Sequence, residues 1–319
     1  MVVAPRDAVD LERLDTLAAE RGIALSADAP LAPLTTLRVG GAADRLLEAN
    51  TRDELLAALG LAREAGVPWF VLGNGSDLVV ADAGIRGLVI RNRARRVAVD
   101  AQRLDADAGA PMALLVRSCS TAGLAGLEFG TSIPGTLGGA VWANAGAHGR
   151  EMSDVVVAVE AWDPSAGSLV NIEADACRFS YRESRFKETS EVVIAATLAL
   201  GSDNPDAIAA RVAANQAQRV ATQPLADQNA GSVFRNPPGD HAGRLIDAAG
   251  LKGLRVGTAS VSRLHANFIV TDRGGRAADV RALGDRVRAE VSAQFGIGLA
   301  YEIEFVGEWP GADAGEPGS

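Results

Sequence analysis

The sequence predicts an α+β fold that is divided into more than one domain. The chain has 319 residues, whereas a single domain typically has about 100–150. Short strand-like runs occur in clusters with helices between them, and a regular alternation of strand and helix would instead indicate a parallel sheet. No repeat of fixed length is found along the chain, which argues against a repeat architecture.

The first predicted elements are two helices with short strands between them. Apolar residues at helical spacing predict a helix over residues 8–21. Strands are predicted at Leu37–Val39 and Arg45–Glu48, on either side of a double-glycine turn. The second helix is predicted to begin after Thr51, because Thr51 and Glu54 match the capping box of a helix N-terminus.

Glycine and proline mark the boundaries of the later elements. An apolar strand at Trp69–Leu72 stops at a glycine loop and resumes at Leu78–Val80, and Pro111 indicates the first turn of a helix that reaches Thr121. The remaining predicted strands cover residues 155–162, 168–172, 191–200, 256–261, 267–271 and 301–306. The remaining predicted helices cover residues 205–219, 242–249 and 277–294. We expect the tail from Gly311 to be frayed.

The composition excludes several classes of partner. Acidic residues outnumber basic ones by 40 to 31, which gives a net charge of −9 and opposes binding to nucleic acid. We interpret the basic run Arg91–Arg96 as a turn between strands. No apolar run approaches the ~20 residues of a membrane-spanning helix, and Arg6, Asp7 and Asp10 argue against a secretory signal. We therefore expect a cytoplasmic protein that binds neither nucleic acid nor membranes.

Lysine, cysteine and histidine are too scarce for several kinds of site. Neither of the two lysines, Lys187 and Lys252, lies in the Gly-Lys-Ser/Thr of a phosphate-binding loop. Two cysteines and three scattered histidines do not match the ligand spacing of a zinc site. The sequence thus predicts no metal site, and it leaves open whether Cys119 and Cys177 form a disulfide.

Two glycine-rich segments are candidates for ligand binding. The loop at residues 73–77, GNGSD, offers backbone N–H groups that suit a pyrophosphate, although a tight β-turn is the plainer explanation. It is not the Rossmann fingerprint, because Leu78 replaces the third glycine. The segment from Gly130 to Gly149 allows the backbone to lie directly against a flat or charged ligand, and its alternative is a structural loop at a helix start.

Polar residues in three later segments are candidates for substrate binding and catalysis. Arg182 and Lys187 suit a carboxylate or a phosphate. Ser232 has no neighbouring histidine that would make it a nucleophile, so we interpret it as a donor or acid. Glu302 and Glu304 alternate along a predicted strand and share one face. A charged turn, a loop serine and a solvated strand face remain the respective alternatives.

Eight ordered segments together resemble the UDP-N-acetylenolpyruvoylglucosamine reductase family, also called UDP-N-acetylmuramate dehydrogenases. They are TLRVGG at 36–41, GNGSD at 73–77, SIPGTLGGA at 132–140 with NAGAHG at 144–149, YRESRFK at 181–187, QPLADQNAGSVFRNP at 223–237, AGRLIDAAGLKG at 242–253, HANFIV at 265–270 and YEIEF at 301–305. The resemblance implies an N-terminal lead-in at residues 1–30, an FAD-binding domain of the p-cresol methylhydroxylase or vanillyl-alcohol oxidase type in two subdomains at 31–203, a smaller α+β substrate domain at 204–308 and a flexible tail at 309–319.

The same resemblance implies an activity and a set of site residues. Such enzymes use NADPH and FAD to reduce UDP-N-acetylglucosamine enolpyruvate to UDP-N-acetylmuramate in peptidoglycan precursor synthesis, and we expect a monomer. Arg182 would bind the substrate carboxylate, Glu302 would assist through a hydrogen bond, and Ser232 would protonate the α-carbon. The implied substrate-binding residues are Tyr181, Lys187, Arg235 and Asn236. The implied FAD-binding residues are Gly73, Asn74, Gly75, Ser76, Asp77, Ser132, Ile133, Pro134, Gly135, Thr136, Gly139, Asn144 and Gly146.

Several residues depart from the family pattern. Asp77 stands where asparagine is usual, and a carboxylate beside a pyrophosphate is unfavourable unless it points away or accepts backbone N–H bonds. His148, Arg235 and Thr131 also differ from the usual residues. The short connection after Lys187 indicates the shorter class of these reductases, which lacks an extra lid segment. Another flavin oxidase or dehydrogenase on the same fold, or a non-catalytic nucleotide-binding module, remains an alternative.

Overall fold

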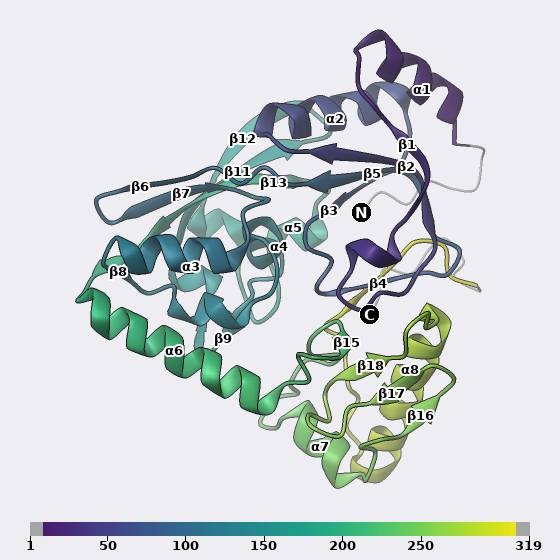
Figure 1. Cartoon of the computed structure of the whole chain (residues 1–319), viewed down its shortest axis with the longest axis vertical. Helices are drawn as coiled ribbons and strands as arrows, with labels where there is room; N and C mark the ends of the chain where they lie inside the picture. The colour runs from purple at the N-terminus through teal and green to yellow at the C-terminus, as the bar shows by residue number, and fades with distance from the viewer. Residues whose placement is uncertain (1–8, 311–319) are drawn as a thin grey trace. The chain divides into compact units, whose positions relative to one another are not determined.

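The computed structural model describes residues 9–310 (Figure 1). Helices and strands follow one another irregularly, and the strands pair mostly antiparallel, so the predicted α+β class is confirmed. None of the helices in residues 9–310 is long and apolar enough to cross a membrane. The predicted frayed tail from Gly311, and the start of the predicted lead-in at residues 1–8, lie outside the described residues.

The described residues form two compact units, and each unit is built from separate stretches of chain. Unit 1 contains residues 9–26, 45–74 and 87–219, and unit 2 contains residues 27–44, 75–86 and 220–310. Four elements of the described chain contain residues of both units. They are strands β1 (Ser26–Pro30), β2 (Ala42–Ala49) and β5 (Ile85–Asn92) and helix α6 (Pro205–Thr222).

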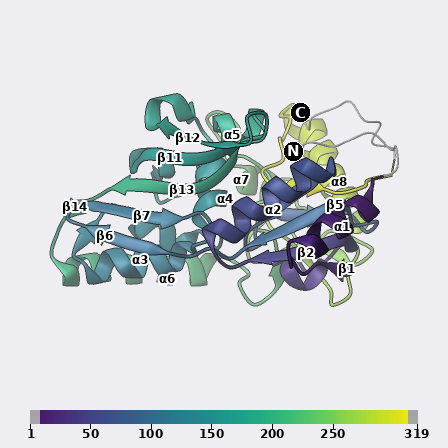
Figure 2. The same ribbon diagram turned by 90° about the horizontal axis from the view of Figure 1, so that it is seen from above.

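The larger sheet of unit 1 has five antiparallel strands in the order β12–β11–β13–β7–β6. Its strands are β6 (Val97–Asp100), β7 (Arg103–Asp107), β11 (Val156–Asp163), β12 (Ser168–Glu173) and β13 (Val192–Ala199). Helix α3 (Met112–Thr121) packs against β6, as Figure 2 shows, and α4 (Leu137–Trp142) packs against β7 and β13. The buried side chains between these elements include Leu104, Leu115 and Leu198, so this core supports the glycine-rich segment that contains α4.

A second sheet has the order β1–β2–β5–β3, with β3 at Trp69–Leu72. Helices α1 (Leu11–Glu20) and α2 (Arg52–Ala65) pack on each other, and a core that includes Leu14, Leu59 and Ile90 lies beneath them. As predicted, α2 begins after Thr51, whose Oγ1 accepts a hydrogen bond from the Glu54 N–H at 3.2 Å.

Unit 2 contains a four-stranded sheet, β15–β18–β17–β16, with helix α8 against β16, β17 and β18 (Figure 1). The elements are β15 (Gln228–Asn229), α7 (Ala242–Ala248), β16 (Arg255–Val256), β17 (Ala259–Val261), β18 (Ile269–Thr271) and α8 (Ala277–Phe295). A parallel pair of β4 (Leu78–Val80) and β19 (Glu304–Val306) completes it. The small remaining elements of unit 1 are β8 (Leu124–Ala125), β9 (Gly146–Ala147), β10 (Arg150–Glu151), α5 (Arg185–Glu188) and β14 (Gly201–Ser202).

Two predicted strands are wrong in detail. No strand forms at Leu37–Val39: the two apolar residues are buried, but Arg38 between them has φ 57° and the backbone turns there. The predicted strand at 256–261 is instead the hairpin of β16 and β17, because Gly257 adopts φ 50° and reverses the chain. In both cases a turn lies inside a run that alternates like a strand.

Candidate cofactor and substrate site

In unit 1 the start of the GNGSD loop lies directly against the second glycine-rich segment. A Cβ atom on Gly73 would lie 2.6 Å from Thr136 Oγ1, so the two segments meet at a distance that excludes a side chain. Asn74 Nδ2 donates a hydrogen bond to the Pro134 carbonyl at 3.1 Å. Two motifs that were identified separately in the sequence are therefore neighbours in the fold.

The rest of the loop belongs to unit 2. Gly75 has φ 60°, and a Cβ atom on it would lie 2.6 Å from the Leu34 carbonyl oxygen. The carbonyl of Asp77 accepts a hydrogen bond from the Glu304 N–H at 3.0 Å, which continues the pairing of β4 with β19. Within residues 9–310, the backbone N–H groups of Asn74, Gly75 and Ser76 make no hydrogen bond. Consecutive unused donors of this kind fit the pyrophosphate of a dinucleotide cofactor such as FAD.

The segment from Ser132 to Gly146 is held by buried polar contacts. Asn144 is fully buried, and its amide donates to the Ser180 carbonyl at 2.9 Å and accepts from the Ser153 N–H at 2.9 Å. Gly146 lies so close to the neighbouring strand that a Cβ atom would be 2.5 Å from the Arg150 carbonyl oxygen. Asn144 thus fixes the segment that precedes Tyr181.

Ser132 and His148 form an exposed pair, one before and one after helix α4 in the chain. Ser132 Oγ lies 2.8 Å from His148 Nε2, and His148 has φ 54°. The predicted residues Ile133, Pro134, Gly135 and Gly139 lie between η2 (Glu128–Ser132) and the first turn of α4. The departure from the family pattern at His148 therefore supplies a polar partner for a predicted cofactor-binding serine.

Tyr181 and Arg182 form the tip of a tight turn in unit 1. Ser180 and Glu183 pair across the turn, and Arg182 has φ 57°. The Arg182 guanidinium lies 5.0 Å from the centroid of the Tyr181 ring and donates to the Gly146 carbonyl at 2.9 Å. This contact brings the predicted carboxylate-binding arginine to the glycine-rich segment.

Lys187 lies five residues after Arg182, in the short helix α5. Its Nζ is 4.3 Å from the centroid of the Trp142 ring in α4. Ser184 Oγ also donates to the Trp142 carbonyl, at 2.6 Å. The cation thus contacts the helix within the glycine-rich segment, and it belongs to the same unit as Arg182.

The segments that carry Ser232 and Glu302 are joined in unit 2 by main-chain hydrogen bonds. The Glu302 N–H donates to the Val233 carbonyl at 2.8 Å, and the Arg235 N–H donates to the Ala300 carbonyl at 2.9 Å. Both Ser232 and Glu302 are half-buried. Strand β19 begins only at Glu304, so the predicted strand from residue 301 is wrong at its start, and Glu302 lies on the segment that pairs with residues 233–235.

Tyr301 supports the paired segments of Ser232 and Glu302, a role that the sequence motif at 301–305 did not indicate. Its ring stacks on Phe234 with centroids 5.1 Å apart, and its hydroxyl donates to Asp285 Oδ1 at 2.8 Å. Burial, followed by the hydrogen bond to Asp285, raises the pKa of Tyr301. A Cβ atom on Gly284 would lie 2.5 Å from the Tyr301 hydroxyl oxygen, so α8 needs glycine at that position.

Asn236 also has a structural contact within unit 2. Its Oδ1 accepts a hydrogen bond from the Ala242 N–H at 3.1 Å, at the first residue of α7.

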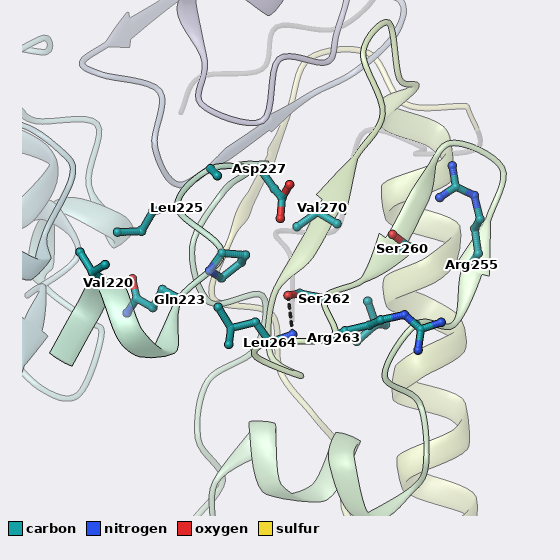
Figure 3. Close-up of a pocket in the computed structure, with 14 residues that line it drawn as sticks. Val220, Gln223, Leu225, Asp227, Arg255, Ser260, Ser262, Arg263, Leu264 and Val270 are labelled. Carbon is teal, nitrogen blue, oxygen red and sulfur yellow. Dashed lines mark hydrogen bonds between the residues drawn. The ribbon is translucent and has the colours of Figure 1, made fainter. Parts of the chain in front are cut away.

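A cavity of about 840 Å³ lies in unit 2 (Figure 3). The loop at residues 223–227, the residues from Ser260 to Leu264 and the side chains of Arg255 and Val270 line it. Val220, Leu225 and Leu264 give it an exposed apolar rim. The sequence motif at 223–237 covers part of this lining, but the contribution of residues 253–264 was not predicted.

Comparison with known proteins gives the family of the chain. A family model described as the C-terminal domain of UDP-N-acetylenolpyruvoylglucosamine reductase matches residues 223–306, and a model described as an FAD binding domain matches residues 43–173. UDP-N-acetylenolpyruvoylglucosamine reductase 2 of Symbiobacterium thermophilum is 43% identical over 302 residues, which cover 94% of this chain and 97% of the relative. The reductase of Moorella thermoacetica is 46% identical over 88% of this chain and 92% of its own.

A solved structure agrees with these relatives. The crystal structure of the reductase from Thermus caldophilus has a TM-score of 0.76 and 36% identity, and the match covers 89% of this chain and 98% of that chain. The predicted fold class, an FAD-binding domain with a smaller C-terminal α+β domain, is confirmed. The chain belongs to the UDP-N-acetylenolpyruvoylglucosamine reductase family and is a flavoprotein oxidoreductase.

Proposed function

We propose that the protein reduces UDP-N-acetylglucosamine enolpyruvate to UDP-N-acetylmuramate, with NADPH as the source of hydride. The observation that carries the proposal is the main-chain pairing of the Ser232 segment with the Glu302 segment, which supplies an acid and a carboxyl group from one rigid part of unit 2. When bound, FAD would accept hydride from NADPH and deliver it to the β-carbon of the enolpyruvyl group. The other steps fall to side chains of this chain.

Arg182 is proposed to bind the carboxylate of the enolpyruvyl group. Negative charge develops on the α-carbon and the carboxylate as the β-carbon gains hydride, so a fixed cation there stabilises the transition state more than the ground state. The φ of 57° and the hydrogen bond to the Gly146 carbonyl hold the guanidinium in place before the substrate arrives. A guanidinium can contact both carboxylate oxygens, which an ammonium group cannot reproduce.

Ser232 is proposed to protonate the α-carbon, with Glu302 as a hydrogen-bonding partner of the same developing charge. No hydrogen bond of the Ser232 hydroxyl is found within the described residues, so its proton is available to a ligand. A serine is a weak acid in water, and the transfer requires an enolate held within ~3 Å in a closed site. The main-chain pairing around Val233 keeps the two side chains on adjacent segments.

The nucleotide part of the substrate is proposed to use the cavity of unit 2. Its volume, about 840 Å³, falls in the range of ligand pockets, and Arg255 and Arg263 bring cations to its lining. Asn236, Arg235 and Lys187 are proposed to contact the diphosphate, and Tyr181 is proposed to bind another part of the substrate.

The test measures the two half-reactions of the FAD-loaded protein without oxygen. NADPH should bleach the flavin absorbance, and UDP-N-acetylglucosamine enolpyruvate should then restore it with formation of UDP-N-acetylmuramate. A purified protein that binds no FAD would contradict the proposal. Failure of NADPH to bleach the flavin, combined with reduction by another substrate and reoxidation by oxygen, would instead identify an oxidase.

A further inference from the structure

Asn267 forms a buried clamp on the segment that follows Ser232. The Asn267 side chain is 4% exposed. Its Oδ1 accepts a hydrogen bond from the Phe234 N–H at 3.0 Å, and its Nδ2 donates to the Phe234 carbonyl at 2.8 Å. One side chain therefore satisfies both main-chain polar groups of a buried residue, as a neighbouring strand would.

The main chain of Asn267 extends this clamp toward Ser232. The Val233 N–H, which belongs to the peptide bond that leaves Ser232, donates to the Asn267 carbonyl at 2.8 Å. The carbonyl of Val233 faces the other way and accepts from the Glu302 N–H at 2.8 Å. The Val233–Phe234 segment thus lies between Asn267 on one side and the Glu302 segment on the other.

A second asparagine holds the chain just before Ser232. Asn229 Oδ1 accepts from the Gly231 N–H at 3.0 Å, and Gly231 has φ 79°. Asn229 Nδ2 donates to the Pro224 and Asp227 carbonyls at 3.0 and 2.9 Å. Because the residues on both sides of Ser232 are tied by hydrogen bonds, the remaining freedom of the serine is mainly the rotation of its own side chain.

We propose that Asn267 is a positioning residue, which sets the location of the Ser232 hydroxyl relative to Glu302 through the backbone of Val233 and Phe234. The inference rests on the proposed roles of Ser232 and Glu302. Asn267 touches no reacting atom. Its effect follows from geometry, since a misplacement of about 1 Å at a reacting group can cost on the order of 100-fold in rate.

Two variants remove the clamp in different ways. Asn267→Ser deletes both side-chain hydrogen bonds to Phe234. Asn267→Asp keeps the shape, but a carboxylate places an acceptor against the Phe234 carbonyl, whereas the protonated acid regains the donor. Two titratable residues bond this part of the structure: His265, whose Nδ1 accepts from the Asn267 N–H at 3.2 Å, and Glu302, whose N–H donates to the Val233 carbonyl. The wild-type pH profile therefore serves as the reference. The matched control is Thr271→Val, which removes a buried hydrogen bond to the Leu37 carbonyl in the same unit.

The first readout is kinetic. In Asn267→Ser, reoxidation of the flavin by UDP-N-acetylglucosamine enolpyruvate should slow by on the order of 100-fold, while reduction by NADPH stays near wild type. In Asn267→Asp, the loss should diminish as the pH falls, relative to wild type. Thr271→Val should leave both half-reactions near wild type. Equal effects on the two half-reactions, no effect on either, or no recovery of the Asp variant at low pH would contradict the proposal.

The second readout does not depend on turnover. Hydrogen exchange in the FAD-loaded protein should accelerate at the Val233, Phe234 and Glu302 amides in Asn267→Ser, and not in Thr271→Val. Unchanged exchange at all three amides would overturn the clamp even if activity fell. Loss of bound FAD in both Asn267 variants would also contradict it, because it would show a general structural role. If the wild type failed to use the sugar, the proposed function would fail, and the exchange measurement would still decide whether Asn267 orders these residues.

Discussion

Gly73 is the residue at which the two glycine-rich motifs meet. A methyl group there would lie 2.6 Å from Thr136 Oγ1, and Thr136 is buried and cannot move aside easily. Overpacking of this kind destabilises the local folded structure by about 1–3 kcal/mol. We predict that Gly73→Ala raises the dissociation constant of FAD by about 10–100-fold, measured by fluorescence titration of the flavin-free protein. Gly60→Ala is the control, because no atom lies within 4 Å of a Cβ at that helix position; equal affinities in the two variants would contradict the prediction.

Arg182 offers a test of charge against geometry. Arg182→Lys keeps the positive charge but loses the forked contact to a carboxylate. We predict that reoxidation of the flavin by the enolpyruvyl sugar slows by about 100-fold or more, while reduction by NADPH is little changed. Stopped-flow measurement of each half-reaction checks this. A lysine variant with nearly full sugar turnover would show that Arg182 does not bind the carboxylate.

The two cysteines are structural. Both are free and buried, so the disulfide that the sequence left open does not form. Burial raises the pKa of Cys119 to about 12 and that of Cys177 to about 11, so the reactive thiolate is scarce at neutral pH. We predict that a thiol reagent at pH 8 labels both residues in denaturant and neither in the native protein, as read by mass spectrometry. Rapid native labelling of either thiol would contradict their burial.

At the scale of single elements, helix α8 depends on Asp279 in its first turn. The backbone N–H and the hydroxyl of Thr258 donate to Asp279 Oδ2 at 2.8 and 2.7 Å, and these bonds hold the pKa of the carboxyl below its usual value of 3.8. The ionised form is therefore favoured by folding. The contribution of the ionised Asp279 carboxylate to the free energy of unfolding is complete above pH 3.8. It is lost as the pH falls through the lower pKa of the folded state.

We accordingly predict that Asp279→Ala destabilises the protein by about 1–2 kcal/mol at pH 7, and that its difference from wild type in melting temperature shrinks below about pH 4. Asp206→Ala is the control. Asp206 also lies in the first turn of a helix, α6, and its carboxylate makes no hydrogen bond within the described residues. If the melting temperature of Asp279→Ala stayed equally far below that of wild type at low pH, the charge of Asp279 would not be the cause of the destabilisation.

Elements with their own local signals were predictable from the sequence. Helix α2 has its N-cap at Thr51 and ends before Gly66, whose φ is 71°. The glycine loop that follows Trp69–Leu72 predicts the end of β3. The turns at Arg38 and Gly257 were missed because the residues around them alternate like a strand. The turn at Arg38 is held by a tertiary contact, the hydrogen bond from Thr271 Oγ1 to the Leu37 carbonyl at 2.9 Å, which a local pattern does not contain.

At the scale of the whole molecule, the order of the motifs predicted the family and the FAD-binding domain, and the comparisons confirm both. The sequence could not predict how distant segments support the site. Asn267 and Tyr301 contact Phe234 from positions 33 and 67 residues away in the chain (267 − 234 and 301 − 234), and neither has a local pattern that assigns it this role. Candidate ligand-binding residues thus lie in recognisable motifs, whereas the residues that hold their segments do not.

Ser232 is proposed to protonate the substrate in a flavin-dependent reduction, and Ser232→Ala tests this role most directly. Each half-reaction of this variant is measured separately by the flavin absorbance, without oxygen. We predict that reduction by NADPH stays near the wild-type rate while reoxidation by UDP-N-acetylglucosamine enolpyruvate falls by orders of magnitude. Equal losses in the two half-reactions, or reoxidation at the wild-type rate, would contradict the role of Ser232 as the acid.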